Sequence, residues 1–427
     1  METNTSKFIK RDILEDLIKH LDKKQISLII GPRQVGKTTL MTFLRDYLTG
    51  KNEKSLYLSL DFETDRKYFD SQISLIEKIR LDLGDKKGFV FIDEIQRKEN
   101  AGIFLKGIYD MDLPYKFIVS GSGSVELKEK VHESLAGRKM TFEVEPVSFF
   151  EFFNYKTDYK YENNLEKYFL VEKDKSFSFL NEYLNFGGYP RVILAETLEE
   201  KKRELDEIFR SYIEKDIAML LKVEKTDAFS SLIKILASQI GGILNYTEIA
   251  NTLGISLPTV KNYIDYLEKT YIVRRISPFF RNTRKEISKS PIVYFLDLGL
   301  RNYALGALGN LTRPDDFGFL FQNLTFNTLF SHFKFLNPRI NFWRTTDKTE
   351  VDFVINYTER IVPIEVKYKE FSTPVIARSL RSFIEKYNPD RALIITKDFS
   401  YNININKTAV EFMPFWLFAI NLKNKKL

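Results

Sequence analysis

The chain of 427 residues contains no cysteine, which excludes a disulfide framework, a thiolate zinc site and a cysteine nucleophile. Its three histidines, His20, His132 and His332, lack ligand spacing, so a histidine-based metal site is not expected. The sequence also lacks any run of about 18 apolar residues, and charges interrupt residues 1–20, where a signal peptide would need an apolar core. We therefore expect a soluble, cytoplasmic protein without a membrane segment.

Length and composition predict several folded domains. At roughly 150 residues per domain, the 427 residues allow two or three hydrophobic cores, and 44% hydrophobic with 29% charged residues is an ordinary globular composition. The net charge of +7 is uneven: residues 1–250 hold 39 basic and 42 acidic side chains, whereas residues 251–427 hold 26 and 16. This excess predicts a C-terminal part that faces a polyanion, although a basic face that only keeps the chain in solution fits the count equally well.

A phosphate-binding loop is predicted where an apolar strand at 26–30 meets an amphipathic helix. In GPRQVGKTTL, two glycines, Lys37 and Thr38 complete the pattern G-x-x-x-x-G-K-[ST]. Backbone N–H groups of such a loop surround phosphates, Lys37 would reach the β and γ oxygens, and the Thr38 hydroxyl would ligate Mg²⁺. The residues predicted to bind ATP are Gly31, Pro32, Arg33, Gln34, Val35, Gly36, Lys37, Thr38 and Thr39.

Two further strands end in polar residues. GFVFIDEIQR places Asp93 and Glu94 after an apolar run, where Asp93 would hold Mg²⁺ through water and Glu94 would polarise the attacking water. Alone, such a run is often only a strand that enters a solvated loop, but the phosphate loop upstream favours the catalytic interpretation. YKFIVSGSGS ends in Ser120 and Ser122, which could sense the γ-phosphate or simply cap the next helix. With YLSLDFE and TFEVEP, these strands predict a five-stranded parallel sheet over 26–146.

Several segments together carry a resemblance. GPRQVGKTTL, FIDEIQR, VSGSGS, SLAGR followed by EVEPVSFFEFF, and FGGYPRV look like the prokaryotic AAA-type ATPases whose C-terminal half is a domain of unknown function, and the match spans nearly the whole chain. The resemblance implies an α/β P-loop NTPase with an ASCE-type parallel sheet, and self-association becomes an expectation. It also makes Arg138 of LAGR a candidate for sensing the γ-phosphate, in its own subunit or a neighbour, with an ordinary surface arginine as the alternative.

The middle of the chain predicts helices. Residues 156–240 alternate charged and apolar positions with helical period, which is typical of a connector or lid, and residues 187–190 mark a hinge-like break. The following segment, ILNYTEIANTLGISLPTVKNYIDYLEKTYIVRRI, predicts two helices joined at Gly254 and a strand. That order is typical of a helix-turn-helix with a wing.

Basic residues of this module predict DNA binding. Lys261 and Asn262 would face outward on the second helix, because Val260, Ile264 and Leu267 share its apolar face. The hairpin that follows adds Arg274, Arg275, Arg281, Arg284, Lys285 and Lys289. The residues predicted to contact DNA are Lys261, Asn262, Arg281, Arg284 and Lys285. Winged helices also dock proteins, which is the alternative interpretation.

The C-terminal part contains a second candidate site. INFWRTTDKTEVDFVI and RIVPIEVKYKE predict two strands joined by a hairpin, on which Asp352, Glu365 and Lys367 converge if the strands pair. Two carboxylates would hold Mg²⁺ and the lysine would orient the attacking water, whereas a solvated hairpin with cross-strand ion pairs is the alternative. The family resemblance implies a restriction-endonuclease-like (PD-(D/E)xK) fold here. Such domains commonly carry a Glu in the preceding helix, where this chain has Gln322.

These predictions combine into one functional hypothesis and one rival. The domains are expected at 1–155 (P-loop ATPase), 156–229 (helical connector or lid), 230–300 (winged helix) and 301–427 (restriction-endonuclease-like). The hypothesis is an ATPase with ATP and Mg²⁺ that engages DNA, with a C-terminal domain that is a weak Mg²⁺-dependent nuclease or a DNA-binding relic. The rival is a regulatory scaffold without nuclease activity, in which the ATP state controls docking of a protein partner.

Overall fold

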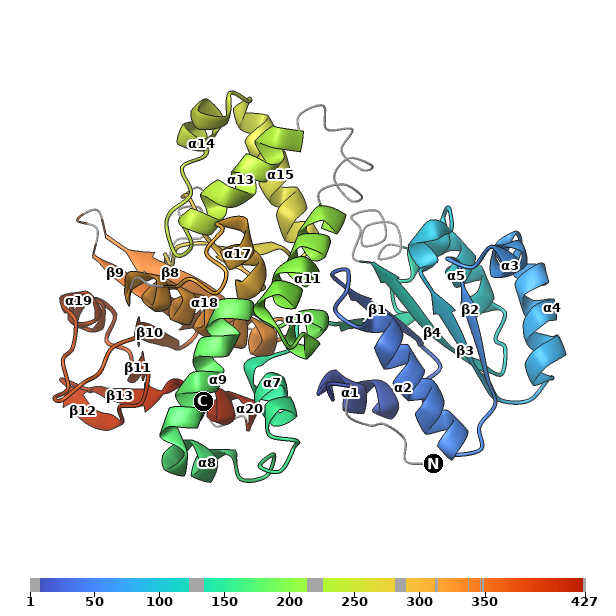
Figure 1. Cartoon of the computed structure of the whole chain (residues 1–427), viewed down its shortest axis with the longest axis horizontal. Helices are drawn as coiled ribbons and strands as arrows, with labels where there is room; N and C mark the ends of the chain where they lie inside the picture. The colour runs from blue at the N-terminus through green and yellow to red at the C-terminus, as the bar shows by residue number, and fades with distance from the viewer. Residues whose placement is uncertain are drawn as a thin grey trace.

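The computed structural model describes residues 8–122, 134–212, 226–280, 289–311, 314–336, 338–345, 347 and 349–424. The predicted DNA contacts Arg281, Arg284 and Lys285 lie outside this described part. Figure 1 shows the N-terminal sheet and its helices on one side of the molecule and the later elements on the other. Among the described residues, no helix combines the length and apolar composition that crossing a membrane requires.

The N-terminal part contains the predicted five-stranded parallel sheet. Its strands are β1 (Ile26–Gly31), β2 (Ser55–Ser59), β3 (Gly88–Asp93), β4 (Tyr115–Ser122) and β5 (Lys139–Glu143), in the order β2-β3-β4-β1-β5. Every pairing in this order is parallel. Because β4 lies between β1 and β3, the strand before the phosphate loop and the strand that ends in Asp93 flank the same neighbour.

Helices cover both faces of this sheet, because its strands are apolar on both faces. The helical elements are α1 (Ile13–Lys19), α2 (Lys37–Gly50), α3 (Glu63–Arg66), η2 (Lys67–Phe69), α4 (Gln72–Leu83), η3 (Ile95–Arg97) and α5 (Ala101–Asp110). Ile29 belongs to one apolar cluster with Leu40 and Leu44 of α2, whereas its neighbour Leu28 belongs to another with Leu105 of α5. The alternation along β1 therefore places α2 and α5 on opposite faces.

The predicted connector, residues 156–229, is helical in its described part. It contains α8 (Leu165–Val171), α9 (Lys173–Phe186), α10 (Pro190–Leu194) and α11 (Leu198–Arg210), and α7 (Phe149–Lys156) leads into it from the predicted ATPase domain. Phe149 of α7 contacts Tyr183 of α9 and Phe415 near the C-terminus, with ring centroids 5.6 and 5.9 Å apart. The segment that follows the N-terminal sheet thus shares a core with the connector and with the C-terminal part.

The segment after the connector has the helix, turn and strand order that the sequence predicts. It comprises α13 (Thr226–Ser238), α14 (Tyr246–Leu253), α15 (Leu257–Lys269) and the antiparallel pair β6 (Val273–Ile276) and β7 (Ile292–Phe295). Gly254 ends α14 in the left-handed conformation (φ 62°), and the Ser256 side chain caps α15 by accepting a hydrogen bond from the Thr259 N–H. Val260, Ile264 and Leu267 are fully buried, as their spacing predicts.

The C-terminal part is built on a six-stranded mixed sheet. Its strands are β8 (Arg339–Arg344), β9 (Glu350–Asn356), β10 (Ile361–Lys367), β11 (Arg391–Thr396), β12 (Tyr401–Ile405) and β13 (Thr408–Pro414), in the order β12-β13-β11-β10-β9-β8. Its helices are α17 (Leu298–Ala304), α18 (Pro314–Phe333), α19 (Arg378–Tyr387) and α20 (Phe415–Lys423). β9 and β10 form the predicted antiparallel hairpin, with Phe353 opposite Ile364.

Candidate functional site

The loop from Gly31 to Lys37 joins β1 to α2 and depends on its glycines. A Cβ atom on Gly31 would lie 2.2 Å from the Val144 carbonyl oxygen, so a larger residue does not fit there. Gly36 has a φ of +94°, which side-chain-bearing residues rarely adopt. Lys37 is 6% exposed, and its Nζ donates hydrogen bonds to the carbonyls of Gly31 (3.1 Å) and Pro32 (2.7 Å). Lys37 is therefore hydrogen-bonded to the loop that is predicted to bind phosphate.

Asp93 is the polar centre beside this loop. Its Oδ2 accepts hydrogen bonds from the Thr38 hydroxyl (2.9 Å) and the Tyr57 hydroxyl (2.7 Å). Its Oδ1 accepts from the Ser120 hydroxyl and from the Glu94 backbone N–H at 3.0 Å. Burial raises the pKa of Tyr57, so the phenol remains a donor to the carboxylate. Thr38, Asp93 and Ser120, taken from three separate motifs, therefore meet at the carboxyl end of the sheet.

Glu94 occupies a strained turn directly after β3. Its φ is +58°, in the left-handed region that non-glycine residues seldom adopt. Burial raises the pKa of its carboxyl and Asp93 raises it further, whereas Lys37 opposes this effect. The Gln96 side-chain amide donates to the Glu94 carboxylate, and its Oε1 accepts from the Ser122 N–H at 3.0 Å. Gln96 therefore joins the predicted base to the end of β4.

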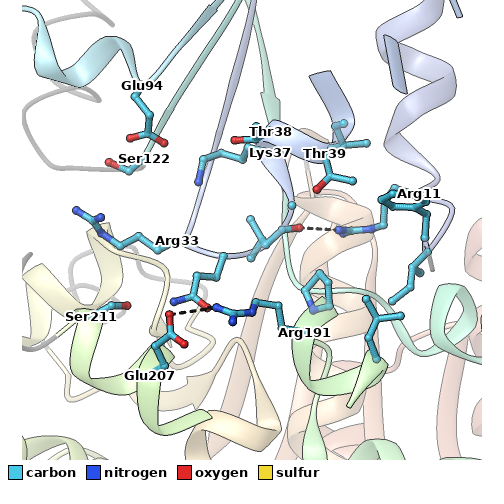
Figure 2. Close-up of a pocket in the computed structure, with 18 of the residues that line it drawn as sticks. Arg11, Arg33, Lys37, Thr38, Thr39, Glu94, Ser122, Arg191, Glu207 and Ser211 are labelled. Carbon is cyan, nitrogen blue, oxygen red and sulfur yellow. Dashed lines mark hydrogen bonds and ion pairs between the residues drawn. The ribbon is translucent and has the colours of Figure 1, made fainter. Parts of the chain in front are cut away.

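A cavity of about 710 Å³ opens above these residues. Lys37, Thr38, Thr39, Glu94 and Ser122 line it from the sheet side. Its other walls come from the N-terminal segment, α10 and α11, and include Phe8, Ile9, Arg11, Pro190, Arg191, Leu194 and Arg210. The volume falls within the range of roughly 300–1,000 Å³ that is typical of small-molecule sites. Figure 2 shows these elements around the loop.

The C-terminal residues converge as predicted. The Asp352 carboxylate accepts hydrogen bonds from the Val366 N–H (2.7 Å) and from the Gln322 side-chain amide (3.0 Å), and the Lys367 ammonium lies 2.6 Å from a Glu365 oxygen. Glu350 pairs with Arg344 at 3.0 Å, so it does not complete a third carboxylate at this point. Among the described residues, no group of three or more acidic or histidine side chains is arranged to hold a metal ion.

Burial dominates the electrostatics of this cluster. It raises the pKa of Asp352 well above the ordinary value, and the nearby Glu365 carboxylate adds to the shift. Burial also raises the pKa of Glu365. Burial opposes protonation of Lys367, but the Glu365 and Asp352 carboxylates outweigh it and raise the lysine pKa. Two carboxylates and one ammonium therefore share a poorly solvated space.

Family models match three parts of the chain. Residues 23–153 match the model described as an AAA domain. The N-terminal part is therefore similar to an AAA domain, and we refer to it as the AAA domain. Residues 178–310 and 317–417 match two models described as domains of unknown function (DUF8612 and DUF4143).

Relatives that match most of the chain are also found. The chain is 27% identical to the uncharacterized protein MJ1544 of Methanocaldococcus jannaschii, over 97% of this chain and 92% of the relative. It is 26% identical to the uncharacterized protein Rv2008c of Mycobacterium tuberculosis, over 90% and 79%.

Solved structures give weaker similarity. Aeropyrum pernix ORC1 in complex with DNA has 13% identity and a TM-score of 0.29, with coverage of 68% of this chain and 91% of that one. A variant of Thermotoga maritima RuvB has 16% identity and a TM-score of 0.32, with coverage of 63% and 90%. Scores at this level do not establish a shared overall architecture.

Arg138 lies at the wrong end of the AAA sheet for a phosphate sensor in its own subunit. Its carbonyl accepts a hydrogen bond from the N–H of Ile26, the first residue of β1, and its guanidinium pairs with Asp110 at 2.7 Å. The phosphate loop follows the last residue of β1, roughly 16 Å away at about 3.3 Å per residue. The expectation of a role within the same subunit is therefore wrong, and the role towards a neighbouring subunit stays a prediction.

The AAA site contains residues that the sequence alone does not single out. Arg191 of α10 donates to Gln34 of the phosphate loop at 3.4 Å and pairs with Glu204 (2.8 Å) and Glu207 (3.1 Å) of α11 (Figure 2). The FGGYPRV segment carries the signal for Arg191, but its contact with the loop depends on the fold. Tyr57 and Gln96 are likewise recognisable only once β2, β3 and β4 are neighbours.

The described polar and basic residues of the predicted DNA-binding module differ in their surroundings. Lys261 and Asn262 are exposed on α15, as predicted. Arg275 instead pairs with Asp265 and Glu268, at 2.6 Å to each, and Arg274 approaches Glu268 at 3.5 Å. These two arginines are therefore engaged within the chain, which lowers the positive charge that they present outward.

Proposed function

We propose that the chain is a Mg²⁺-dependent ATPase. The observation that carries this proposal is the convergence of Lys37, Thr38 and Glu94 on one cavity, with Asp93 bonded to the Thr38 hydroxyl. Lys37 would neutralise charge on the β- and γ-phosphates, and Glu94 would polarise the attacking water. The raised pKa of Glu94 suits it to accept a proton, because a stronger base draws more charge from the water.

Thr38 and Asp93 would hold the metal ion. The Thr38 hydroxyl would ligate the ion directly and Asp93 would hold it through water, and their oxygens lie 2.9 Å apart. A site with few protein ligands suits Mg²⁺, which usually keeps several waters and binds substrate phosphates as well. When bound, Mg²⁺ would supply positive charge to the phosphate oxygens.

The proposed partner of the C-terminal half is DNA. Support comes from the basic excess of residues 251–427, from exposed Lys261 and Asn262 on α15, and from the order of α13–α15, β6 and β7, which is that of a winged helix. In this proposal the nucleotide state of the AAA domain controls how the C-terminal half engages duplex DNA.

The C-terminal cluster is proposed as a restriction-endonuclease-like site of low activity. Asp352 and Glu365 would bind one Mg²⁺, and Lys367 would orient water beside a phosphate. The cluster lacks a third carboxylate, since neutral Gln322 stands where such domains commonly carry a Glu and its amide donates to Asp352. We therefore expect slow or undetectable cleavage with Mg²⁺, and more with Mn²⁺, which accepts mixed ligands more readily.

The rival function is an ATP-controlled scaffold for a protein partner. The internal pairing of Arg274 and Arg275 favours it, because those side chains are less able to contact phosphates. In this version DNA would not change ATP hydrolysis.

The ATPase rate with and without duplex DNA, at two salt concentrations, separates the two functions. DNA should stimulate the wild-type protein. Replacing Arg281, Arg284 and Lys285 together by alanine should flatten the dependence of log affinity on log salt by about three units, because each phosphate contact releases roughly one counterion. The matched control replaces Lys86, Lys106 and Lys202, three exposed lysines of the N-terminal half, and should leave the slope unchanged. An unaltered slope in the first variant would support the scaffold.

A further inference from the structure

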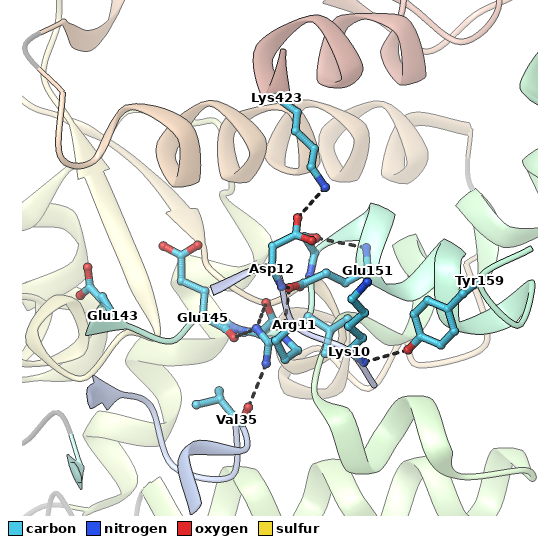
Figure 3. A network of polar contacts seen from close by, with 12 residues as sticks. Lys10, Arg11, Asp12, Val35, Glu143, Glu145, Glu151, Tyr159 and Lys423 are labelled. Atoms are coloured by element: carbon cyan, nitrogen blue, oxygen red, sulfur yellow. Dashed lines mark hydrogen bonds and ion pairs between the residues drawn. The ribbon is translucent and has the colours of Figure 1, made fainter. Parts of the chain in front are cut away.

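The N-terminal segment before α1 lies beside the phosphate loop and also lines the cavity. Within it, Arg11 is 8% exposed, and its guanidinium reaches three backbone carbonyls. It donates hydrogen bonds to Val35 (3.1 Å), Glu145 (2.6 Å) and Pro146 (3.4 Å). Figures 2 and 3 show the bond from Arg11 to Val35, at the middle of the loop.

The Val35 carbonyl determines the orientation of a predicted phosphate ligand. In a trans peptide, the carbonyl of one residue and the N–H of the next point in opposite directions. The chain has no cis peptide among the described residues, so a Val35 carbonyl that faces Arg11 turns the Gly36 N–H away from Arg11, towards the inner side of the loop. The hydrogen bond from Arg11 matters for the orientation of this peptide, because glycine is conformationally permissive and Gly36, with a φ of +94°, does not fix its own backbone.

A buried carboxylate keeps Arg11 in place. The Glu151 side chain of α7 lies 3.2 Å from the Arg11 Nε, and both side chains are less than a tenth exposed. Glu151 also accepts hydrogen bonds from the Asp12 N–H and the Ser148 N–H, at 2.8 Å each (Figure 3). A buried charge that is ion-paired and hydrogen-bonded is costly to move, so the guanidinium is a rigid support.

An ion pair links the residues around Arg11 to the C-terminal half. Glu145, whose carbonyl accepts from Arg11, pairs through its side chain with Lys334 after α18 at 2.8 Å. Both side chains are largely buried, with 11% of Lys334 and 19% of Glu145 exposed. Arg11 thus contacts both the phosphate loop and Glu145, the residue that forms the ion pair with Lys334 of the C-terminal half.

We propose that Arg11 is a positioning residue of the nucleotide site, which holds the Val35 carbonyl so that the Gly36 N–H faces the phosphates. The inference rests on the proposed function, that this loop binds ATP. An arginine is required because its planar fork supplies several donors in fixed directions, whereas lysine supplies a single point charge. The nucleotide need not touch Arg11 for this effect.

The test compares nucleotide affinity in matched variants. Arg11→Met alone would leave Glu151 buried and unpaired, so it is combined with Glu151→Gln, which retains hydrogen-bonding groups for the Asp12 and Ser148 N–H groups. The control is Lys10→Met with Glu162→Gln, which removes a neighbouring ion pair (3.1 Å) on the surface. Arg11→Lys keeps the charge and supplies the conservative variant.

Calorimetric titration should show Kd values for ATP and ADP raised about 10- to 100-fold in the Arg11→Met, Glu151→Gln variant, as expected for a lost charge-assisted hydrogen bond. The value of kcat at saturating ATP should stay within about twofold, because the Gly36 N–H contacts the phosphates in both the ground and transition states. Arg11→Lys should restore part of the affinity. The surface control should match the wild type.

Equal Kd values in the Arg11→Met, Glu151→Gln variant and the surface control would overturn the inference. If that variant melts at a lower temperature, Arg11→Lys decides the question, since it keeps Glu151 paired: wild-type affinity in it overturns the inference and reduced affinity supports it. Failure of the proposed function looks different. In that case the wild-type protein would bind ATP no better than Lys37→Ala, and the Arg11 variants would not be the cause.

Discussion

The nucleotide site and the C-terminal cluster both place carboxylates on or directly after strands, but they differ in the groups that donate hydrogen bonds to those carboxylates. Three of the four donors to Asp93 are side-chain hydroxyls, those of Thr38, Tyr57 and Ser120. The donors to Asp352 are amides, one from a side chain and one from the backbone. The first site opens onto a large cavity, whereas Asp352 of the second is bonded to Gln322 and Val366, and one buried oxygen of Glu365 has no hydrogen-bond partner among the described residues.

This difference matters for metal binding. A hydroxyl oxygen both donates and accepts, so Thr38 can keep its hydrogen bond to Asp93 and still present a lone pair to Mg²⁺. A backbone N–H has no acceptor capacity, so the Val366 N–H that bonds Asp352 offers the ion nothing. Two carboxylates beside a lysine therefore do not by themselves indicate a nuclease. The groups that surround the carboxylates in the free protein determine whether a cation can bind.

The largest expected effect concerns hydrolysis at the nucleotide site. Lys37→Ala should abolish ATP binding, because Lys37 is the loop cation that is placed for the β- and γ-phosphates. Glu94→Gln should retain bound ATP and slow hydrolysis by about 100-fold or more, since charge stabilisation and positioning dominate phosphoryl transfer. Binding is measured by calorimetry and turnover by phosphate release.

The control for that pair of variants is Glu99→Gln, which removes an exposed carboxylate a few residues further along the chain. It should hydrolyse ATP at the wild-type rate. Equal rates for Glu94→Gln and Glu99→Gln would remove Glu94 from its assigned role. The nucleotide site would then have no identified catalytic base to set against the C-terminal cluster.

A smaller effect is expected when the C-terminal cluster is given the carboxylate that it lacks. Gln322→Glu places a negative charge where the amide now donates to Asp352, 3.0 Å away. Without metal, this repulsion should lower the melting temperature, because burial already raises the pKa of Asp352. Mn²⁺ should reverse the loss and bind about tenfold or more tightly than in the wild type, since a divalent ion offsets the added charge.

Ser331→Glu adds the same charge to an exposed position of α18 and should show no shift with Mn²⁺. Any DNA cleavage by either protein should disappear in Asp352→Ala and in Lys367→Ala. Brisk Mg²⁺-dependent cleavage that survives Asp352→Ala would place the nuclease elsewhere. Identical responses of Gln322→Glu and Ser331→Glu would show that the cluster stays closed to cations.

Much of the nucleotide site could be predicted from the sequence, because local pattern and strand order determine it. The loop glycines, Lys37 and the Asp93–Glu94 pair each follow an apolar strand, and parallel strands bring their carboxyl ends to one edge. Arg138 shows the limit of such reasoning. A motif states which residues are neighbours along the chain, but not that LAGR precedes β5 and so lies at the opposite edge.

The remaining site residues could not be predicted because their contacts join distant segments. Arg11 and Val35 are 24 residues apart, and Arg191 and Gln34 are 157 apart. Neither pair forms a spacing pattern that periodicity can reveal. In the C-terminal cluster the convergence of Asp352, Glu365 and Lys367 was predictable from a hairpin, whereas the hydrogen bonds that close it depend on how α18 packs.

The smallest expected effect sharpens the description of the open site. Gln96 donates a hydrogen bond to the Glu94 carboxylate, which stabilises the charged form and holds the Glu94 pKa below the value that burial alone would impose. Gln96→Leu should therefore raise that pKa further. Because Glu94 acts as its carboxylate, the ATPase rate falls as pH drops through this pKa, so the acid limb of the pH–rate profile should move to higher pH.

At the optimum pH, the same variant should reduce kcat about tenfold or less and leave KM nearly unchanged, since Gln96 acts on Glu94 and the phosphate contacts of the loop persist. The control is Gln25→Leu, which removes a side-chain amide that donates to Gly137 at 3.3 Å, far from Glu94 at the other end of the sheet. A general loss of stability would lower the rate at every pH without moving the acid limb. An acid limb that is the same in Gln96→Leu, Gln25→Leu and the wild type would show that Gln96 does not position the base.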